Sequence, residues 1–419
     1  MNIEVNAHRL KTDFSALSQI GATSVGGLNR PSLSPAHLEA RNWFQQRIIE
    51  AGLEFRVDGA GNHSAYFDCG PPGAPTLLLG SHLDTVPNGG KYDGALGVLA
   101  ALEALRRVKE QALTLPVNLE AIDFTDEEGS LIGLLGSSAV AGTLTAAKLE
   151  KARGGQGLFA AALGRAGLSH TGLLSARREP ASLAGYLELH IEQGLLLEAS
   201  GAHIGVVTHI PGICSYRLFF LGRADHAGTV PMTDRLDAAQ GASAFILALR
   251  EILSSEFADC FANVGQVHFE PGAFNIVPEK AVLALEFRSI DQERFAQLES
   301  ALLARSRLEA ARFGLGVEVQ YLDRIAPAAM DPHIQMAITK TADSMGLKSM
   351  RMPSRAGHDA QSLSQICPSG MIFVPSVGGT SHSPAEYTHW QDCLNGANVL
   401  LNAAVRLAFS QGKTESKDE

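Results

Sequence analysis

A repeated alternation of apolar strand, polar motif and helix constrains the fold of this chain most. The apolar run "TLLLG" (76–80) leads into "SHLDTVPNGGKYDG" (81–94), and helical periodicity follows over residues 93–111. A second apolar run (117–125) ends in the acidic motif "DEEG", and a third run of this kind covers residues 186–194. Strands that alternate with helices of this length form parallel sheets covered by helices, because each parallel connection needs a crossover. We therefore predict an α/β fold built around a mostly parallel sheet.

The middle of the chain has a different order of elements. Over residues 212–326 the pattern predicts strand, helix, two strands, helix and strand. That β-α-β-β-α-β order is the ferredoxin-like arrangement of an α+β domain. We expect a discontinuous first domain, residues 1–211 and 327–419, with residues 212–326 inserted as a compact second domain. The polar end of the chain, residues 411–419, is predicted to be disordered.

Composition and charge exclude several classes of partner. The 419 residues are 45% hydrophobic, and their net charge of −10 includes no run of basic residues. Nucleic acid is therefore not an expected partner, because its binding depends on clustered Lys and Arg. No uninterrupted apolar run approaches the roughly 18 residues of a membrane span, so we expect no membrane association. Five scattered cysteines without a Cys-x-x-Cys pair, and an N-terminus unlike a signal peptide, indicate a cytoplasmic protein.

Polar residues follow the predicted strands of the first domain. A single histidine beside a strand is most often a structural residue, and adjacent glutamates most often form a solvated turn. Because ligands bind at the carboxyl ends of parallel strands, however, we expect these side chains to lie together. Imidazole and carboxylate groups suit zinc, manganese, cobalt or nickel, and three histidines, a bridging aspartate and a glutamate are enough for two ions. The polar residues are His82, Asp84, Asp93, Asp126, Glu127, Glu128, His190 and His382.

Two further acids have predicted roles beside such ions. We expect the Asp84 carboxylate to accept the second ring proton of His82 and so fix the orientation of the ring. Glu127 is expected to take a proton from metal-bound water, because it stands next to a candidate ligand.

The order of these motifs resembles the metal-dependent amidohydrolases and exopeptidases of the M20 family. More narrowly, the chain resembles the hydantoinase/carbamoylase branch, which contains N-carbamoyl-L-amino acid hydrolases, β-ureidopropionase and allantoate amidohydrolase. A histidine at position 190 favours this branch, because M20 peptidases usually place a carboxylate there. The stretches that carry the resemblance span residues 80 to about 390 and are "GSHLDTVPNGGKYDGALGV", "FTDEEG", "LELHIEQG", "GRADHAGTVPMTDRLDA", "FNIVP", "AGHDA" and "MIFVPSVGGTSHSPAE".

The resemblance implies a site for two divalent ions, Zn²⁺ or Mn²⁺, with Co²⁺ or Ni²⁺ as further candidates. One ion would bind His82, Asp93 and His190. The other would bind Asp93, Glu128 and His382, so that Asp93 bridges the pair. The family's fold implies a di-zinc-peptidase-like catalytic domain with an inserted lid domain, through which the protein would form a homodimer.

The resemblance also implies substrate-binding residues. His226 in "ADHAG" would stabilise the oxyanion and reach the site of a partner subunit, and Gln193 would hydrogen-bond the substrate. Asn275 and Arg288 would hold the substrate carboxylate, for which a guanidinium group is well shaped. His358 in "AGHDA" would contact the group that is cleaved. Other roles stay open, since Arg288 also suits an exposed strand position and His226 also suits a loop cap.

Three departures from the family pattern bear on the substrate. Leu131-Ile132 stand where many relatives have Arg-Phe, and "EFR" (286–288) replaces the usual "DIR". Arg355 replaces a glycine in "SRAGHDA" and would place a cation at the edge of the site. From Arg355 we expect a substrate contact and a substrate that differs from the commonest carbamoyl amino acids.

The expected reaction is hydrolysis of a C–N bond in a ureido or amide group of a small carboxylate, with Glu127 as general base. An N-carbamoyl-L-amino acid, converted to the amino acid, carbon dioxide and ammonia, is the first candidate. The alternatives are hydrolysis of allantoate, hydrolysis of a plain amide by an M20 aminoacylase or peptidase, and a non-catalytic binding protein on the same fold.

Overall fold

The computed structural model describes residues 2–411 and divides into two compact units. Unit 1 comprises Met1–Thr208 and Met330–Glu419, and unit 2 comprises His209–Ala329. These limits differ by a few residues from the expected boundaries because the short strands β7 (His209–Ile210) and β12 (Ala328–Ala329) pair with each other inside unit 2. The tail predicted to be disordered lies, from residue 412 onward, outside the described residues.

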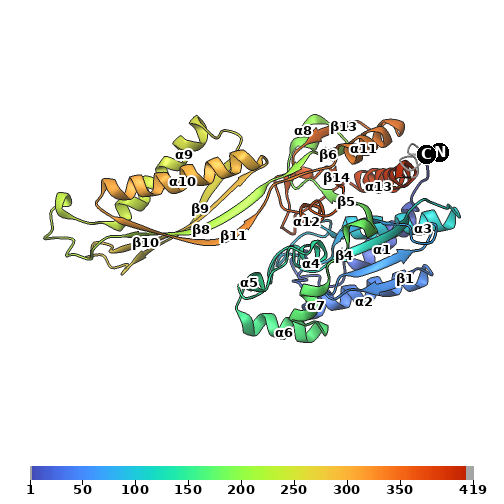
Figure 1. The fold of residues 1–419 in the computed structure, drawn as a ribbon, viewed down its shortest axis with the longest axis horizontal. Helices are drawn as coiled ribbons and strands as arrows, with labels where there is room; N and C mark the ends of the chain where they lie inside the picture. The colour runs from blue at the N-terminus through green and yellow to red at the C-terminus, as the bar shows by residue number, and fades with distance from the viewer. Residues whose placement is uncertain (1, 412–419) are drawn as a thin grey trace. The chain divides into compact units, whose positions relative to one another are not determined.

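Unit 1 is built around a mixed sheet. Its strands are β1 (Glu54–Val57), β2 (His63–Phe67), β3 (Thr76–His82), β4 (Asn118–Phe124), β5 (Leu183–Ile191), β6 (Ile204–Val207), β13 (Ser349–Met352) and β14 (Ser369–Val374). Within residues 2–411 the sheet has eight strands in the order β1-β2-β4-β3-β5-β14-β6-β13 (Figure 1). The central neighbours β4, β3, β5 and β14 run parallel, whereas β1 and β2 join antiparallel at one edge. The predicted α/β fold with a mostly parallel central sheet is confirmed.

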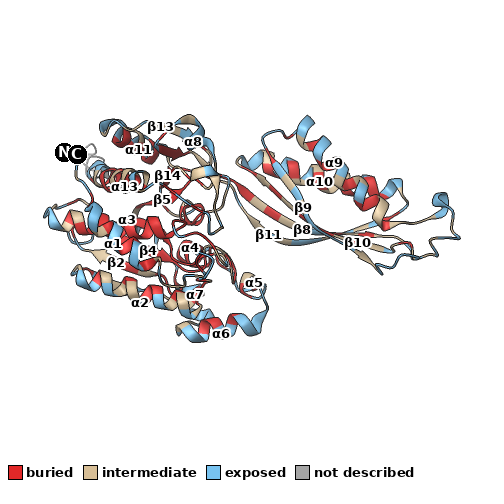
Figure 2. Cartoon of the chain, turned by 180° about the vertical axis from the view of Figure 1, so that it is seen from behind, coloured by how far each residue is buried: buried red, intermediate tan, exposed pale blue. Residues whose placement is uncertain are grey.

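Helices cover this sheet and bury its central strands, as Figure 2 shows. The helix α3 (Ala95–Glu110) packs against β3, β4 and β5, and α13 (Trp390–Gln411) packs against β14, β5 and α3. The helix α12 (Asp359–Leu363) contacts β5, β14 and α4 (Leu135–Ala141). The other helices of unit 1 are α1 (Ala7–Leu17), α2 (Pro35–Glu50), α5 (Ala146–Leu149), α6 (Gln156–Ala166), α7 (His170–Ser175), α8 (Leu196–Ser200) and α11 (Pro332–Ser344), with short 3₁₀ helices η1 (Pro180–Ser182) and η3 (Val377–Gly379).

The parallel centre of the sheet brings the polar motifs to one edge. β3 ends at His82, and β5 carries His190 next to its own end. β4 is followed directly by the loop of Glu127 and Glu128, and β14 by the loop of His382. Because these four strands are parallel neighbours, their carboxyl ends meet at the same edge, where side chains from distant parts of the chain come together.

Unit 2 has its own sheet and its own core. Its elements follow the chain order β8 (Gly212–Leu221), α9 (Ala238–Ser255), β9 (Phe261–Glu270), β10 (Lys280–Ser289), α10 (Gln292–Arg312) and β11 (Gly316–Ile325), with the 3₁₀ helix η2 (Met232–Asp234) before α9. Among the described residues the sheet has four strands in the order β11-β8-β10-β9, and all of its pairs are antiparallel. Buried and half-buried residues alternate along β10, because one face of the sheet packs against the helices.

Two general properties of the chain follow from the same structure. No helix within residues 2–411 is long and apolar enough to cross a lipid bilayer. All five cysteines lie among the described residues and are buried and free, in keeping with the absence of a disulfide pattern in the sequence.

Candidate metal centre

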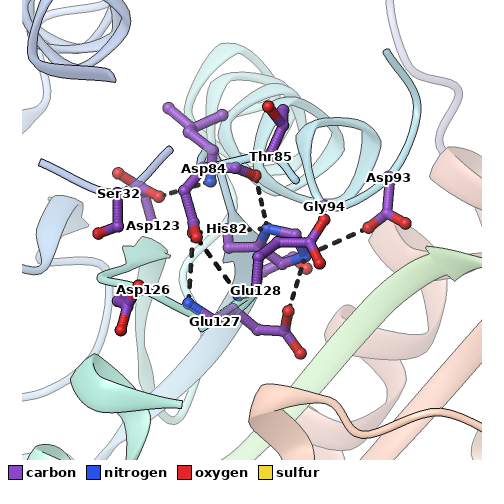
Figure 3. A network of polar contacts seen from close by, with 12 residues as sticks. Ser32, His82, Asp84, Thr85, Asp93, Gly94, Asp123, Asp126, Glu127 and Glu128 are labelled. Carbon is purple, nitrogen blue, oxygen red and sulfur yellow. Dashed lines mark hydrogen bonds and ion pairs between the residues drawn. The ribbon is translucent and has the colours of Figure 1, made fainter. Parts of the chain in front are cut away.

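His82 and His190 each present one ring nitrogen to the same carboxylate oxygen. Nδ1 of His82 lies 3.0 Å from the backbone carbonyl oxygen of Asp84, and Nδ1 of His190 lies 2.9 Å from that of Ile191. A carbonyl oxygen only accepts, so Nδ1 carries the hydrogen in both rings and Nε2 is left with a lone pair. Nε2 of His82 lies 3.4 Å from Oδ1 of Asp93 (Figure 3). Nε2 of His190 lies 3.1 Å from the same oxygen.

The other oxygen of Asp93 faces a second group of ligand atoms. Oδ2 of Asp93 lies 3.5 Å from Nε2 of His382, and this nitrogen lies 3.4 Å from Oε2 of Glu128. Asp93 therefore stands between two sets of donors, one on each of its carboxylate oxygens. Each set has ligand atoms close enough together to hold one cation.

The donor atoms fit divalent cations. Nε2 of His82 is buried and has no hydrogen-bond partner among residues 2–411. A lone pair that faces a carboxylate oxygen in a buried site is unfavourable unless a proton or a cation lies between them. Imidazole nitrogen and carboxylate oxygen are also the donors that zinc and manganese accept.

A third group of candidate ligands lies beside the first one but is hydrogen-bonded within the protein. It consists of Glu188, His190 and His358. The carboxylate of Glu188 accepts hydrogen bonds from Oγ of Ser81 (2.9 Å) and from the backbone N–H of Ala360 (3.0 Å). Because it also shares His190 with the first group, this set is not an independent metal site.

Burial and crowding shift the pKa values of these groups strongly. Burial raises the pKa of Glu127 and of Glu128 well above the usual range for a carboxyl group, and neighbouring acids add to the effect. Burial opposes protonation of His82, but the carboxylates of Glu127, Asp93 and Asp84 outweigh it and raise the pKa of this ring. Burial likewise disfavours ionised Asp93, yet the two histidines hold its pKa low. The cluster thus carries an excess of acid groups that positive charge stabilises.

Asp84 orients its neighbours differently from the sequence-based expectation. The nearest carboxylate oxygen of Asp84 is 3.7 Å from Nδ1 of His82, whereas its backbone carbonyl oxygen makes the hydrogen bond. The Asp84 carboxylate accepts instead from the backbone N–H groups of Glu127 and Glu128, each at 3.3 Å (Figure 3). The prediction that the carboxylate of Asp84 accepts the ring proton of His82 is therefore wrong, because the backbone carbonyl oxygen of Asp84 takes that role. The side chain of Asp84 is directed toward the acidic loop instead.

Glu127 lies at the edge of the cluster, and its side chain is only 10% exposed. Its Oε2 is 3.5 Å from Nε2 of His82. The preceding residue, Asp126, has a positive φ of 58° and accepts backbone hydrogen bonds from Leu131, Ile132 and Gly133. Leu131 and Ile132 are buried in a hydrophobic cluster with residues of α4 to α7. Leu131 and Ile132, which stand where many relatives have Arg-Phe, thus contribute to hydrophobic packing.

Gln193, His358 and Arg355 belong to unit 1 together with the cluster. Nε2 of Gln193 donates to Oδ2 of Asp93 at 2.7 Å and lies 3.3 Å from Nε2 of His382. The ring of His358 is buried, packs edge-on against His190 at 4.6 Å, and has a pKa held well below the usual value by burial. Arg355 is exposed in the loop between β13 and α12. The structure brings Gln193 and His358 to the cluster, and substrate contacts of all three stay a prediction.

The remaining predicted residues belong to unit 2. The loops of His226 and Asn275 lie side by side, because the backbone N–H of Ala227 donates to the carbonyl oxygen of Asn275 at 3.0 Å. His226 is exposed, and its Nδ1 accepts from the N–H of Gly228 at 3.0 Å, so the ring does stabilise its own loop. Nε of Arg288 donates to Glu286 on β10 at 2.9 Å. The expected roles of these three residues at the catalytic site stay predictions.

Comparison with known proteins identifies the family of this chain. Residues 78–406 match the model of peptidase family M20/M25/M40. The chain belongs to this family. An N-carbamoyl-L-amino acid amidohydrolase of Geobacillus stearothermophilus is 36% identical, over 96% of this chain and 99% of that protein. A ureidoglycolate hydrolase of Arabidopsis thaliana is 33% identical, over 97% of this chain and 88% of that protein.

Solved structures agree with this assignment. A hydantoinase/carbamoylase family amidase from Burkholderia phymatum matches with a TM-score of 0.84 at 36% identity, over 98% of this chain and 99% of that one. This M20 family member therefore lies in the hydantoinase/carbamoylase branch and is an amidohydrolase, as the sequence resemblance implies. M20 enzymes are metal-dependent, and the two donor sets around Asp93 are candidate sites for such metals.

Several polar residues around this M20 site have no role predicted from the sequence. Glu386 and Ser381 contact Asp93, and Glu386 closes the motif "SHSPAE", which was a usable signal. The buried pair of Arg41 and Asp123, joined at 2.7 Å, had no such signal, because the partners are far apart in the sequence.

Proposed function

We propose that this M20 amidohydrolase cleaves the C–N bond of a ureido or amide group in a small carboxylate substrate, with an N-carbamoyl-L-amino acid as first candidate. The observation that carries the proposal is the placement of Glu127 beside a cluster in which Asp93 faces histidines on both of its oxygens. Relatives whose names specify carbamoyl and ureido compounds support the substrate class.

Two divalent cations, Zn²⁺ or Mn²⁺, are proposed for the cluster. His82, Asp93 and His190 would hold one, and Asp93, Glu128 and His382 the other. Bound there, such cations supply Lewis acidity, which polarises a carbonyl group and lowers the pKa of water to about 7.

Glu127 is proposed as the general base and acid. It accepts the proton of the attacking water and later gives a proton to the leaving nitrogen. For an N-carbamoyl amino acid, water adds to the ureido carbonyl carbon, the bond to the terminal nitrogen breaks and ammonia leaves. The remaining carbamate releases carbon dioxide and the amino acid. Burial and neighbouring acids raise the pKa of Glu127, and a raised pKa suits a carboxylate that must take up a proton and return it.

Unit 2 is proposed to act as a ferredoxin-like lid and dimerisation domain. In this proposal His226 stabilises the oxyanion, while Asn275 and Arg288 hold the substrate carboxylate. Gln193 and His358 contact the substrate from unit 1, and Arg355 adds a cation near the entrance. A homodimer and a cytoplasmic location belong to the same proposal and await direct tests.

Other substrates remain candidates. A relative named for ureidoglycolate favours ureido acids, including allantoate, as the alternative to carbamoyl amino acids. His190 speaks against a plain-amide aminoacylase or peptidase, because a carboxylate is usual there in M20 peptidases. A non-catalytic binding protein is disfavoured by the presence of Glu127 in its place beside His82.

Ammonia release by the purified protein, supplied with manganese or zinc, tests this function. The panel contains N-carbamoyl-L-amino acids, N-carbamoyl-β-alanine, allantoate, ureidoglycolate and matched N-acetyl amino acids. We expect ammonia from a ureido compound and a loss of at least about 100-fold in Glu127→Ala, which lacks the base. The metal content of that variant should equal that of the wild type.

Three other outcomes of this experiment would change or contradict the proposed function. Loss of metal from Glu127→Ala would show that Glu127 is a ligand and that the roles of the two adjacent glutamates are exchanged. Cleavage of acetyl compounds alone would assign the protein to the aminoacylases. Absence of turnover across the panel, with metal bound, would contradict the proposed substrate class.

A further inference from the structure

Glu386 is a buried carboxylate, only 4% exposed, on the loop that also carries the candidate metal ligand His382. Its Oε1 accepts from the backbone N–H groups of Tyr92 (2.8 Å) and Asp93 (3.1 Å). Its Oε2 accepts from Oγ of Ser381 at 2.8 Å. The Ser381 hydroxyl also lies 3.0 Å from Oδ2 of Asp93. Glu386 thus reaches Asp93 both through its backbone and through Ser381.

These contacts join two loops that are far apart in the sequence. Tyr92 and Glu386 are separated by 294 positions. One loop supplies Asp93, and the other supplies His382, which has a positive φ of 54° and a side chain that is 51% exposed. His82 and His190, in contrast, stand at strand ends and are oriented by backbone carbonyl groups. The position of His382 relative to Asp93 therefore depends much more on loop contacts.

Gly90 shows how closely the first loop surrounds the carboxylate. A Cβ at position 90 would lie 2.0 Å from Cδ and from Oε1 of Glu386. Any larger residue would therefore displace the Glu386 side chain. Gly90 has no positive φ, so an alanine there is acceptable to the backbone and acts mainly through this contact.

We propose that Glu386 is a positioning residue for the donor set Asp93–Glu128–His382. It holds the His382 loop against Asp93, so its loss weakens the binding of one cation much more than that of the other. The inference rests on the proposed function in one respect, namely that two cations bind at this cluster. Carboxylates that orient metal ligands in this way typically affect metal affinity by about 10–100-fold.

Zinc titration of the metal-free protein against a chromophoric chelator tests this role. In Glu386→Ala we expect one tight site to remain and the other to weaken by about 10–100-fold. Glu386→Gln, which keeps an acceptor for the backbone N–H groups, should show a smaller loss. Gly90→Ala should reproduce the loss with Glu386 still present, because it displaces the carboxylate.

Asp58→Asn is the matched control. The Asp58 carboxylate also accepts from two backbone N–H groups, those of Ala60 and Asn62, and from one side-chain donor, Nδ2 of Asn62. It contacts none of the candidate ligands, so both zinc affinities should stay at the wild-type values. Thermal unfolding of each metal-free variant measures how far the fold itself is weakened.

The outcomes separate this inference from the proposed function. Two wild-type zinc sites with unchanged affinities in Glu386→Ala and Gly90→Ala would overturn the positioning role alone. An equal loss at both sites, in proportion to a lowered unfolding temperature, would also overturn it, since that is the result of general destabilisation. A wild-type protein without two zinc sites would overturn both the inference and the two-cation proposal.

Discussion

At the scale of single residues, two buried arginines, Arg30 and Arg41, place positive charge near the acids of the candidate metal centre. Arg30 is fully buried and donates to the backbone carbonyl oxygens of Leu17 and Leu83, and burial lowers its pKa to about 10. Arg41 pairs with Asp123, whose carboxylate also accepts from the backbone N–H of Leu83. Both backbone polar groups of Leu83, the residue after His82, are thus hydrogen-bonded: its N–H to Asp123 and its carbonyl oxygen to Arg30. Removing one partner of such a buried pair leaves an uncompensated charge and costs about 3–5 kcal/mol.

His63 gives a prediction for the dependence of stability on pH. Burial, with a contribution from Arg41, lowers the pKa of His63 to about 3, whereas an unfolded histidine has a pKa of about 6.5. Between these values the unfolded chain binds a proton that the folded chain does not, so the free energy of unfolding falls as pH falls. In His63→Phe this decline should be shallower by up to about 1.4 kcal/mol per pH unit.

The measurement for His63 is denaturant unfolding of metal-free wild type and variant at pH 7, 6, 5 and 4. Phenylalanine keeps the ring that packs edge-on against Phe55, which limits other changes. Parallel pH profiles for the two proteins would show that His63 does not contribute to acid sensitivity.

At the scale of elements, α3 approaches β5 so closely that only glycine fits between them. A Cβ at Gly97 would lie 2.2 Å from the backbone carbonyl oxygen of Leu189. Both elements carry candidate ligands at their ends, Asp93 before α3 and His190 on β5. The absence of a side chain at position 97 therefore allows the close approach of two elements that carry candidate metal ligands.

Gly97→Ala should lower the free energy of unfolding by about 1–3 kcal/mol, since the helix must move away from the strand. Gly164→Ala in α6 is the matched control, because nothing lies within 4 Å of the added Cβ. That substitution should stabilise the protein by about 0.4–1 kcal/mol. Urea unfolding of both variants measures the difference, and equal effects at the two positions would contradict the close-approach argument.

Long elements were predictable from the sequence, whereas short ones were not. The helices α3, α9 and α10 and the strands β8 and β10 lie where periodicity indicates them. The helices α5 and α7 carry no clear periodicity, because they are short and depend on a cluster that includes Leu131 and Ile132. Tertiary packing rather than local preference stabilises such segments.

At the scale of the whole molecule, unit 2 has the properties of an independent domain. Its sheet and helices enclose a separate hydrophobic core. Its two ends pair with each other, His209 with Ala329 and Ile210 with Ala328. The insertion therefore leaves and rejoins unit 1 through adjacent strands, which is the usual arrangement of an inserted domain.

A fragment of residues 209–329 should fold without unit 1. We expect a circular dichroism spectrum of a mixed α/β protein and a single cooperative transition in urea, because the fragment keeps its core and its paired ends. Full-length protein provides the reference for this transition. A fragment without cooperative unfolding would show that unit 2 depends on unit 1 for its stability.

The order of the elements, and the set of polar residues at the ends of the central strands, could be inferred from the sequence alone. Both are local properties: periodicity follows from the geometry of a helix or strand, and motif residues stand next to strand ends. Membership of the M20 family could also be inferred from the sequence, since its motifs extend over residues 80 to about 390 in a fixed order. Parallel pairing of β3, β4, β5 and β14 then brings these ends together.

Which atom of each residue makes a given contact depends on the three-dimensional fold and could not be inferred from the sequence. Asp84 uses its carbonyl oxygen for His82 and its carboxylate for the acidic loop, and Asp93 divides its two oxygens between two donor sets. The contact of Glu386 with Asp93 likewise depends on loops that meet only in the folded chain. Such choices depend on distances of a few ångströms between residues far apart in sequence, and hydrogen bonds and metal coordination are sensitive to distances on that scale.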